Sequence, residues 1–255
     1  NPAPPPLVRV VFQETEGNPF FVEEVYRHLS EEGKLFDESG GWRKDLRVDQ
    51  LQVPEGVRLV VGKRLQRLSE DTRRILTTAA VIGRGFPLRL LEEMESARPD
   101  AAIDALEEAE RAQLVTAETV GREPRYRFVH ELIRQTLAET LFLPRRQRLH
   151  ARIAGAMEKV YGAVLDKHAS AIAHHLYQAG TAADTEKTLR FLLLASEGAR
   201  RSAAHEEALT HLDCALSLLE GESGVPVAEL QERRADVLRS LGRLPDAVAA
   251  YEQAV

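Results

Sequence analysis

Apolar residues recur at intervals of three and four along most of the chain, which is the period of an amphipathic helix. Ala, Leu, Glu and Arg, which favour helices, are abundant, whereas aromatic residues make up only 5% of the sequence. The pattern therefore predicts a mostly helical protein. In the second half, short turns with Gly, Pro or Asp separate the expected helices, which cover residues 148–160, 167–178, 185–200, 206–219, 227–241 and 246–255.

The middle of the chain predicts a different order of elements. Ser69 offers an N-cap for the first helix of this part. Three helices and then two short strands are expected at residues 70–82, 88–94, 100–113, 114–118 and 125–129. A further helix follows the strands. Three helices closed by a two-stranded wing make a winged helix, so the predicted fold class is all-α with a minor β-wing.

The first part of the chain predicts a smaller helical unit. Gly17-Asn18-Pro19 precedes an expected helix that ends at Gly33, and residues 34–42 form an expected hairpin. Another helix is expected from Pro54 to Leu68. The Pro-rich start, residues 1–14, lacks such a pattern and is predicted to be a linker at the edge of a larger protein.

The last helices can be aligned with one another. Two triplets of small or apolar residues share one spacing: Ala208, Leu212 and Ala215, and then Ala247, Tyr251 and Ala254. The second triplet lies 39 positions after the first, about one 34-residue tetratricopeptide period plus an insertion. Such repeats stack around a concave groove, so a tetratricopeptide-like superhelix that binds a protein or peptide partner is predicted. The second triplet also predicts an apolar face for a further repeat or for self-association.

Composition narrows the classes of function. Cys214 is the single cysteine, which excludes an internal disulfide or a zinc site of paired thiolates and predicts the reducing cytoplasm. No apolar run approaches the roughly 20 residues that cross a bilayer. The net charge of -6 gives no general attraction to nucleic acid, and the expected helix at 100–113 carries an acidic face that repels phosphates. A DNA-binding winged helix is therefore the alternative and not the first choice.

Catalytic and metal-binding patterns are weak throughout the sequence. The stretch 56–64 approaches a phosphate-binding loop, but its two glycines are one residue too far apart and Arg64 replaces the magnesium-binding hydroxyl. His168, His174 and His175 lack a metal-ligand spacing. One packed and one solvated imidazole are predicted for the adjacent pair.

The remaining candidate side chains also predict structural roles. Cys214 is expected to be a packed thiol and not a nucleophile. The acidic pairs Glu107-Glu108 and Glu206-Glu207 are expected to lie on solvated helix faces. The chain by itself is therefore not predicted to be an enzyme or to hold a metal or another cofactor.

Two short stretches resemble one known family. Glu-Gly-Asn-Pro-Phe-Phe-Val-Glu-Glu, residues 16–24, resembles the start of the helical lid in signal-transduction ATPases with numerous domains, the STAND branch of the AAA+ superfamily. The family's Gly-x-Pro motif places its proline against the adenine of bound nucleotide, a role that the resemblance implies for Pro19. Phe-Val-His-Glu-Leu-Ile-Arg, residues 128–134, resembles the family's Met-His-Asp motif. There the histidine reaches the β-phosphate of ADP, which implies that role for His130.

Each of these two residues has a structural alternative. Pro19 is also a suitable first residue of a helix. His130, which lies between Val129 and Glu131 where the family has Met and Asp, is also suitable as a helix cap or as a residue that packs on the wing.

The resemblance implies an order of domains and a function. The order is a linker at 1–14, a helical lid at 15–68, a winged helix at 69–143 and tetratricopeptide-like repeats at 144–255. It implies the regulatory and protein-interaction part of a signalling protein switched by Mg-ATP and ADP, of the kind attached to class III adenylate or guanylate cyclases or to LuxR-type transcriptional regulators. The family's phosphate loop, magnesium-binding acids and arginine sensor are absent from the sequence, so no ATPase activity is expected of it. A DNA-binding transcriptional regulator is the alternative function.

Overall fold

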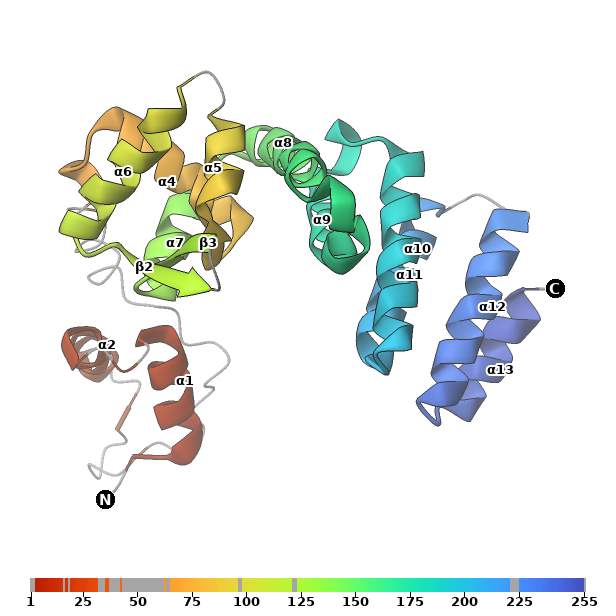
Figure 1. Cartoon of the computed structure of the whole chain (residues 1–255). Helices are drawn as coiled ribbons and strands as arrows, with labels where there is room; N and C mark the ends of the chain where they lie inside the picture. The colour runs from red at the N-terminus through yellow and green to blue at the C-terminus, as the bar shows by residue number, and fades with distance from the viewer. Residues whose placement is uncertain are drawn as a thin grey trace. The chain divides into compact units, whose positions relative to one another are not determined.

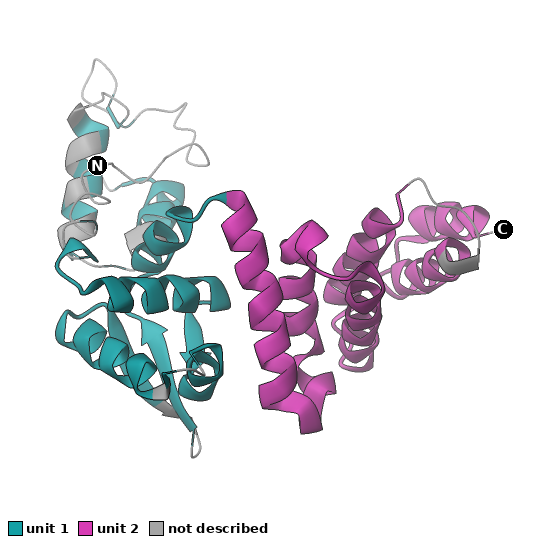
Figure 2. Ribbon diagram, turned by 90° about the horizontal axis from the view of Figure 1, so that it is seen from above, with its two compact units in different colours: residues 1–142 teal, residues 143–255 magenta. Residues whose placement is uncertain are grey.

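The computed structural model of the chain describes residues 3–15, 17, 19–31, 35–36, 42, 62, 65–95, 98–120, 123–220 and 225–254 (Figure 1). The chain divides into two compact units, residues 1–142 and 143–255 (Figure 2). Within the described residues the fold is mostly helical with one small three-stranded antiparallel sheet, which confirms the predicted class of all-α with a minor β part. In the same part of the chain, no helix combines the length and apolar character that crossing a bilayer requires.

A set of helices and the sheet form most of the first unit. Its helices are α4 (Glu70–Ile82), α5 (Leu88–Met94), α6 (Pro99–Arg111) and α7 (Glu131–Glu139), and its strands are β1 (Gly85–Pro87), β2 (Val115–Val120) and β3 (Glu123–Phe128). The strand order is β1-β3-β2, with Phe86 opposite Tyr126 and Val115 opposite Phe128. Phe86 and Phe128 are fully buried. Their aromatic rings therefore join the sheet to the helical core.

The sheet differs from the expected two-stranded wing, because β1 adds a third strand along β3. The sequence prediction missed β1 since three residues ending at Pro87 are too short to show alternation. The hairpin of β2 and β3 is also longer than expected and pairs Val120 with Glu123.

The start of α4 was predicted correctly, but one of its partners was not. The Ser69 hydroxyl accepts a hydrogen bond from the Thr72 backbone N–H, as an N-cap should. Glu108 of α6 accepts from the Ser69 N–H at 2.8 Å, from the Ser69 hydroxyl at 2.8 Å and from the Thr72 hydroxyl at 2.5 Å. Glu108 is therefore half-buried on the expected polar face, and its carboxylate also joins α6 to the first turn of α4, which was not predicted.

Two further helices precede this core in the first unit. Residues 1–14 were expected to be a linker, but Pro5–Thr15 forms α1, which packs on α2 (Pro19–Glu31). Prolines are tolerated in a first helical turn, whose N–H groups have no partner inside the helix. Phe36 pairs with Trp42 in an antiparallel bridge, as the expected hairpin requires. Most of the helix expected from Pro54 lies outside the described residues.

The second unit consists of consecutive helices that each pack on the next one. They are α8 (Leu143–Tyr161), α9 (Leu165–Ala179), α10 (Thr185–Arg201), α11 (His205–Leu218), α12 (Val225–Ser240) and α13 (Leu244–Gln253), with short 3-10 turns η2 (Gly162–Val164) and η3 (Gly180–Ala182). Every helix expected in this half is confirmed. The Asp184 carboxylate caps α10 by accepting from the Lys187 backbone N–H at 2.7 Å.

Candidate functional site

The stretch that carries Pro19 joins α1 to α2. Pro19 is the first residue of α2 and is exposed, which is the position that a helix-starting proline takes. Gly17 has φ +73°, and a Cβ there would lie 2.8 Å from the ring of Phe12. The positive φ favours glycine at this position. The Gly-x-Pro pattern therefore has a local structural role, whatever else it binds.

His130 lies where β3 leads into α7. It takes the N-cap position of α7, and its carbonyl accepts from the Ile133 N–H at 3.1 Å. Its side chain is half-buried and makes no capping hydrogen bond to the helix. The backbone therefore starts the helix here, and the imidazole is not needed for capping.

Arg134, one turn further along α7, fixes this segment to the rest of the unit. Its Nε donates to Glu131 Oε1 at 2.7 Å, and its Nη1 donates to the carbonyl of Ala80 at the end of α4 at 3.0 Å. Sequence reasoning missed this residue, because a bond to a backbone carbonyl 54 positions away leaves no pattern in the sequence.

The two residues proposed to contact nucleotide are on different helices of one unit. Pro19 starts α2 and His130 starts α7, and α1 packs on both of these helices. Both segments therefore belong to one compact unit, and α1 packs on the helix that follows each of them.

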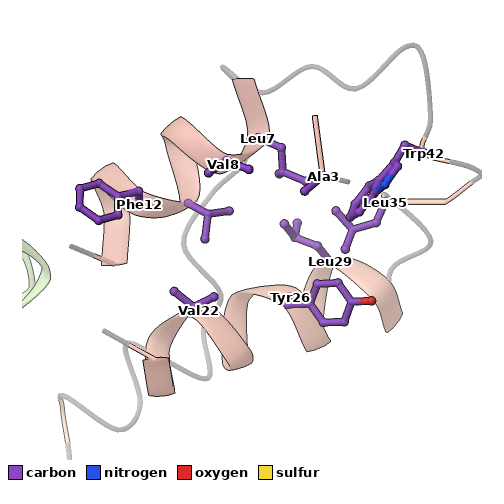
Figure 3. A pocket seen from close by; sticks show the side chains of 10 residues that line it. Ala3, Leu7, Val8, Phe12, Val22, Tyr26, Leu29, Leu35 and Trp42 are labelled. Carbon is purple, nitrogen blue, oxygen red and sulfur yellow. The ribbon is translucent and has the colours of Figure 1, made fainter. Parts of the chain in front are cut away.

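An apolar cavity of about 320 Å³ lies between α1 and α2. Figure 3 shows Leu7 and Leu29 pointing toward one another between the helices, with Trp42 at one end and Phe12 at the other. Ring contacts from Phe36 to Tyr26 and to Trp42, with centroids 6.4 and 4.8 Å apart, lie next to it. This lining suits an apolar group, and among the described residues it contains no cationic side chain that would bind a phosphate.

The two aligned triplets of the second unit are buried to different extents. Ala208, Leu212 and Ala215 of α11 are at most 1% exposed. On α13, Ala247 is 3% exposed, whereas Tyr251 and Ala254 are only half-buried. The Tyr251 hydroxyl donates to Asp236 Oδ1 of α12 at 2.6 Å.

The apolar face expected on the last helix is not the one observed. Ala247 already lies in the interior that α13 forms with α12. The exposed large hydrophobic residues of α13 are Leu244 and Val248, at 59% and 55%. The alignment missed them because it followed the small residues, which pack inside the pair.

A polar cavity of about 270 Å³ lies among α10, α11 and α12. Leu212 and Val237 form its apolar part, and its charged residues are Glu197, Arg200, Arg233 and Asp236. Both acids already accept hydrogen bonds: Glu197 from Arg200, and Asp236 from Arg239 and Tyr251. Two arginines balance two acids in this lining, and Arg200 already donates to Glu197, so Arg233 is the cation best placed to donate to a carboxylate of a bound partner.

No family model, curated protein or solved structure matches the chain.

A histidine pair lies inside the second unit. His175 is 3% exposed whereas His174 is exposed, which confirms the predicted packed and solvated imidazoles. The partner of His175 is His150 of α8, with 2.9 Å between the two Nδ1 atoms. Sequence reasoning missed His150 because it is 25 residues away. No group of three metal-ligating side chains in the described ranges is arranged to hold a metal ion.

A polar contact also joins α9 and α11. The Ser170 hydroxyl donates to Glu207 Oε1 at 2.9 Å and lies 3.1 Å from Nε2 of His211. Glu207 Oε1 is 3.6 Å from that same Nε2. A catalytic triad needs the acid on the other ring nitrogen, so this arrangement does not activate the serine.

Cys214 lies on α11, beyond His211. Its side chain is half-buried, and burial raises the pKa of the thiol above its usual value, although a hydrogen bond with Tyr177 opposes the shift. A raised pKa keeps the thiol protonated and unreactive at neutral pH.

Proposed function

We propose that this chain is the regulatory and protein-interaction part of a STAND-type signalling protein switched by ATP and ADP, and that it works with a nucleotide-hydrolysing core. The order of elements carries the proposal. In the first unit α4, β1, α5, α6, β2 and β3 follow as helix, strand, helix, helix, strand, strand, an order typical of winged helices. Consecutive packed helices come next, as in tetratricopeptide-like repeats.

The nucleotide role rests on the positions of Pro19 and His130. In the proposal, α1 and α2 act as the lid, with Pro19 against the adenine. His130 donates from the winged helix to the β-phosphate of ADP. Its location at the N-terminal end of α7 supports this, because the helix dipole favours an anion there. The half-buried imidazole is also not used to cap the helix.

The second unit is proposed to bind a protein partner through the polar cavity of α10, α11 and α12. Arg200 and Arg233 would bind a carboxylate of the partner, while Leu212 and Val237 contact its apolar part. The partner chemistry that this lining favours is an acidic peptide segment.

The alternative, a DNA-binding regulator, is less well supported. The exposed residues of α6 include Asp100, Asp104, Glu107 and Glu110 but only Arg111 as a base. On the hairpin, Arg127 pairs with Glu118 at 2.9 Å. An acidic helix releases no counterions from DNA. Duplex binding with a steep salt dependence would therefore contradict this interpretation of α6 and favour the DNA-binding alternative.

Calorimetric titration of the chain with ATP and with ADP tests the proposal. With only one side of the site present, we expect binding no tighter than about 1 mM, which corresponds to roughly 4 kcal/mol, and no turnover. Binding near 1 μM, roughly twice that free energy, or measurable hydrolysis would contradict a chain that depends on a separate core.

A further inference from the structure

Two buried imidazoles meet between α8 and α9. The Nδ1 atoms of His150 and His175 are 2.9 Å apart, and the side chains are 7% and 3% exposed. Their ring centroids are 5.1 Å apart. The exposed ring of His174 lies 6.1 Å from His150 and 5.4 Å from His175. Three imidazoles from two consecutive helices therefore gather at one place.

The number of protons on the pair decides whether its hydrogen bond exists. One Nδ1 must carry hydrogen and the other must accept it. When both rings are neutral they take opposite tautomers, and one added proton still leaves an imidazolium that donates to a neutral ring. A second added proton places N–H groups on both sides of the contact and two like charges in a buried site. The bond is then replaced by repulsion.

From this geometry we infer that His150 and His175 form a proton-operated latch. It holds α8 against α9 while at least one ring is neutral, and it releases the two helices when both rings are protonated. The inference goes beyond the proposed nucleotide switch and uses none of its residues.

The surroundings of His150 and of the neighbouring His174 oppose protonation. Burial, then the charge of His174 and then that of Arg146 lower the pKa of His150 from 6.5 to about 4. Burial and then His211 of α11 lower the pKa of His174. The charged groups that lower the pKa of His150 and of His174 are therefore all cationic.

Two acidic groups of α8 and α11 have partners of their own. Glu158 of α8 pairs with Lys187 of α10. Glu207 of α11 contacts Ser170 and lies 3.6 Å from His211. The turns η2 and η3, which also pack on α8 and α9, read Gly-Ala-Val and Gly-Thr-Ala and contain no ionisable side chain.

The direction of the pH response follows from the lowered pKa. When the helices are open, His150 binds a proton with the ordinary pKa of 6.5, whereas in the closed latch the pKa of His150 is about 4. The closed form is therefore fully favoured above 6.5 and loses its advantage as the pH falls from 6.5 toward 4. The opening constant can rise up to about tenfold per pH unit in this window.

Hydrogen exchange of the full chain, corrected for the intrinsic rate at each pH, tests the latch. Between about pH 7 and about pH 5, we expect the opening constant of α8 and α9 to rise roughly twentyfold, while that of α12 and α13 stays nearly constant. No rise in α8 and α9 overturns the inference.

A matched pair of variants separates the latch from general acid sensitivity. In His150→Asn the amide keeps a hydrogen-bonding group near the Nδ1 position but does not titrate. We expect its opening constant to rise less steeply with falling pH than that of the unaltered chain, because only His175 of the pair can still bind a proton, while His205→Asn behaves like the unaltered chain. An undiminished response in His150→Asn contradicts the latch.

A measurement on the unaltered chain tests the latch even if the variant folds poorly. Ring nitrogen NMR at neutral pH should find opposite tautomers on His150 and His175, and the same tautomer on both rings would overturn the inference. Neither readout uses nucleotide, so the latch and the nucleotide proposal can fail separately.

Discussion

Glu108 illustrates how one side chain can join two helices. It accepts three hydrogen bonds from Ser69 and Thr72. The Thr72 hydroxyl, followed by the Ser69 backbone N–H, lowers the pKa of this carboxyl. The stabilisation that the Glu108 carboxylate gives to the folded state is therefore complete above the ordinary carboxyl pKa. It is lost as the pH falls through the lowered pKa of Glu108 in the folded chain.

Glu108→Gln should lower the free energy of unfolding of the first unit by about 1 kcal/mol at neutral pH, because the charged acceptor of the cap is lost. The stability of the variant should also depend less on pH below about pH 5. Glu107→Gln is the control, since Glu107 pairs only with Arg111 at the exposed surface and should change stability by less than about 0.5 kcal/mol. Denaturant unfolding that gives equal losses for both variants would contradict the cap.

His130 and Arg134 are one turn apart on α7 but should respond differently to truncation. Arg134→Ala removes charged hydrogen bonds to Glu131 and to Ala80 and should cost about 1.5–3 kcal/mol. His130→Ala should cost less than Arg134→Ala, because the imidazole makes no capping hydrogen bond to the helix. If thermal unfolding shows a similar loss for both, His130 is a packing residue and its role in the switch is refuted.

At this scale the sequence predicts contacts between near neighbours and misses distant ones. The Ser69 cap was predictable because its partner is three residues away. Glu108 and His150 were not, because their partners lie 36 and 25 positions away and depend on how the helices pack. Pairing across helices is set by tertiary structure, which periodicity alone does not contain.

Among the elements, long amphipathic helices were the most predictable. α4 and α5 begin and end where the pattern places them. α1 and β1 were missed for different reasons: Pro5 and Pro6 conceal a helix start, and β1 has only three residues.

The cavity among α10, α11 and α12 leads to a prediction about partner chemistry. A hexaglutamate peptide should shift the side-chain N–H resonances of Arg200 and Arg233, because both guanidinium groups line the cavity. Arg233→Ala should reduce that shift at Arg200 by at least about threefold if the two groups bind one carboxylate together. Arg148→Ala, a change at an exposed arginine of α8, serves as the control.

A hexalysine peptide distinguishes the possible outcomes of that titration. If it shifts the same resonances equally, the acids Glu197 and Asp236 dominate the cavity. The proposed acidic partner would then be wrong.

For the whole molecule, the proposal joins a nucleotide-sensing first unit to a partner-binding second unit. Element order supports it, together with the positions of Pro19 and His130 at the starts of α2 and α7. The resemblance alone could not predict which of these residues also serves the local fold. The structure narrows this question, because the imidazole of His130 makes no capping bond, whereas Gly17 and Pro19 both serve the turn into α2.

The most direct test is an NMR titration of the chain with ADP. The account predicts weak, saturable shifts of the His130 ring and of the α2 start, in the range of about 1 mM or weaker. His130→Ala should weaken this binding by about tenfold or more, since a hydrogen bond to a charged group is worth about 1.5–3 kcal/mol, and His205→Ala should leave it unchanged. Shifts that avoid His130 and α2, or that survive His130→Ala in full, would contradict a nucleotide switch built on this chain.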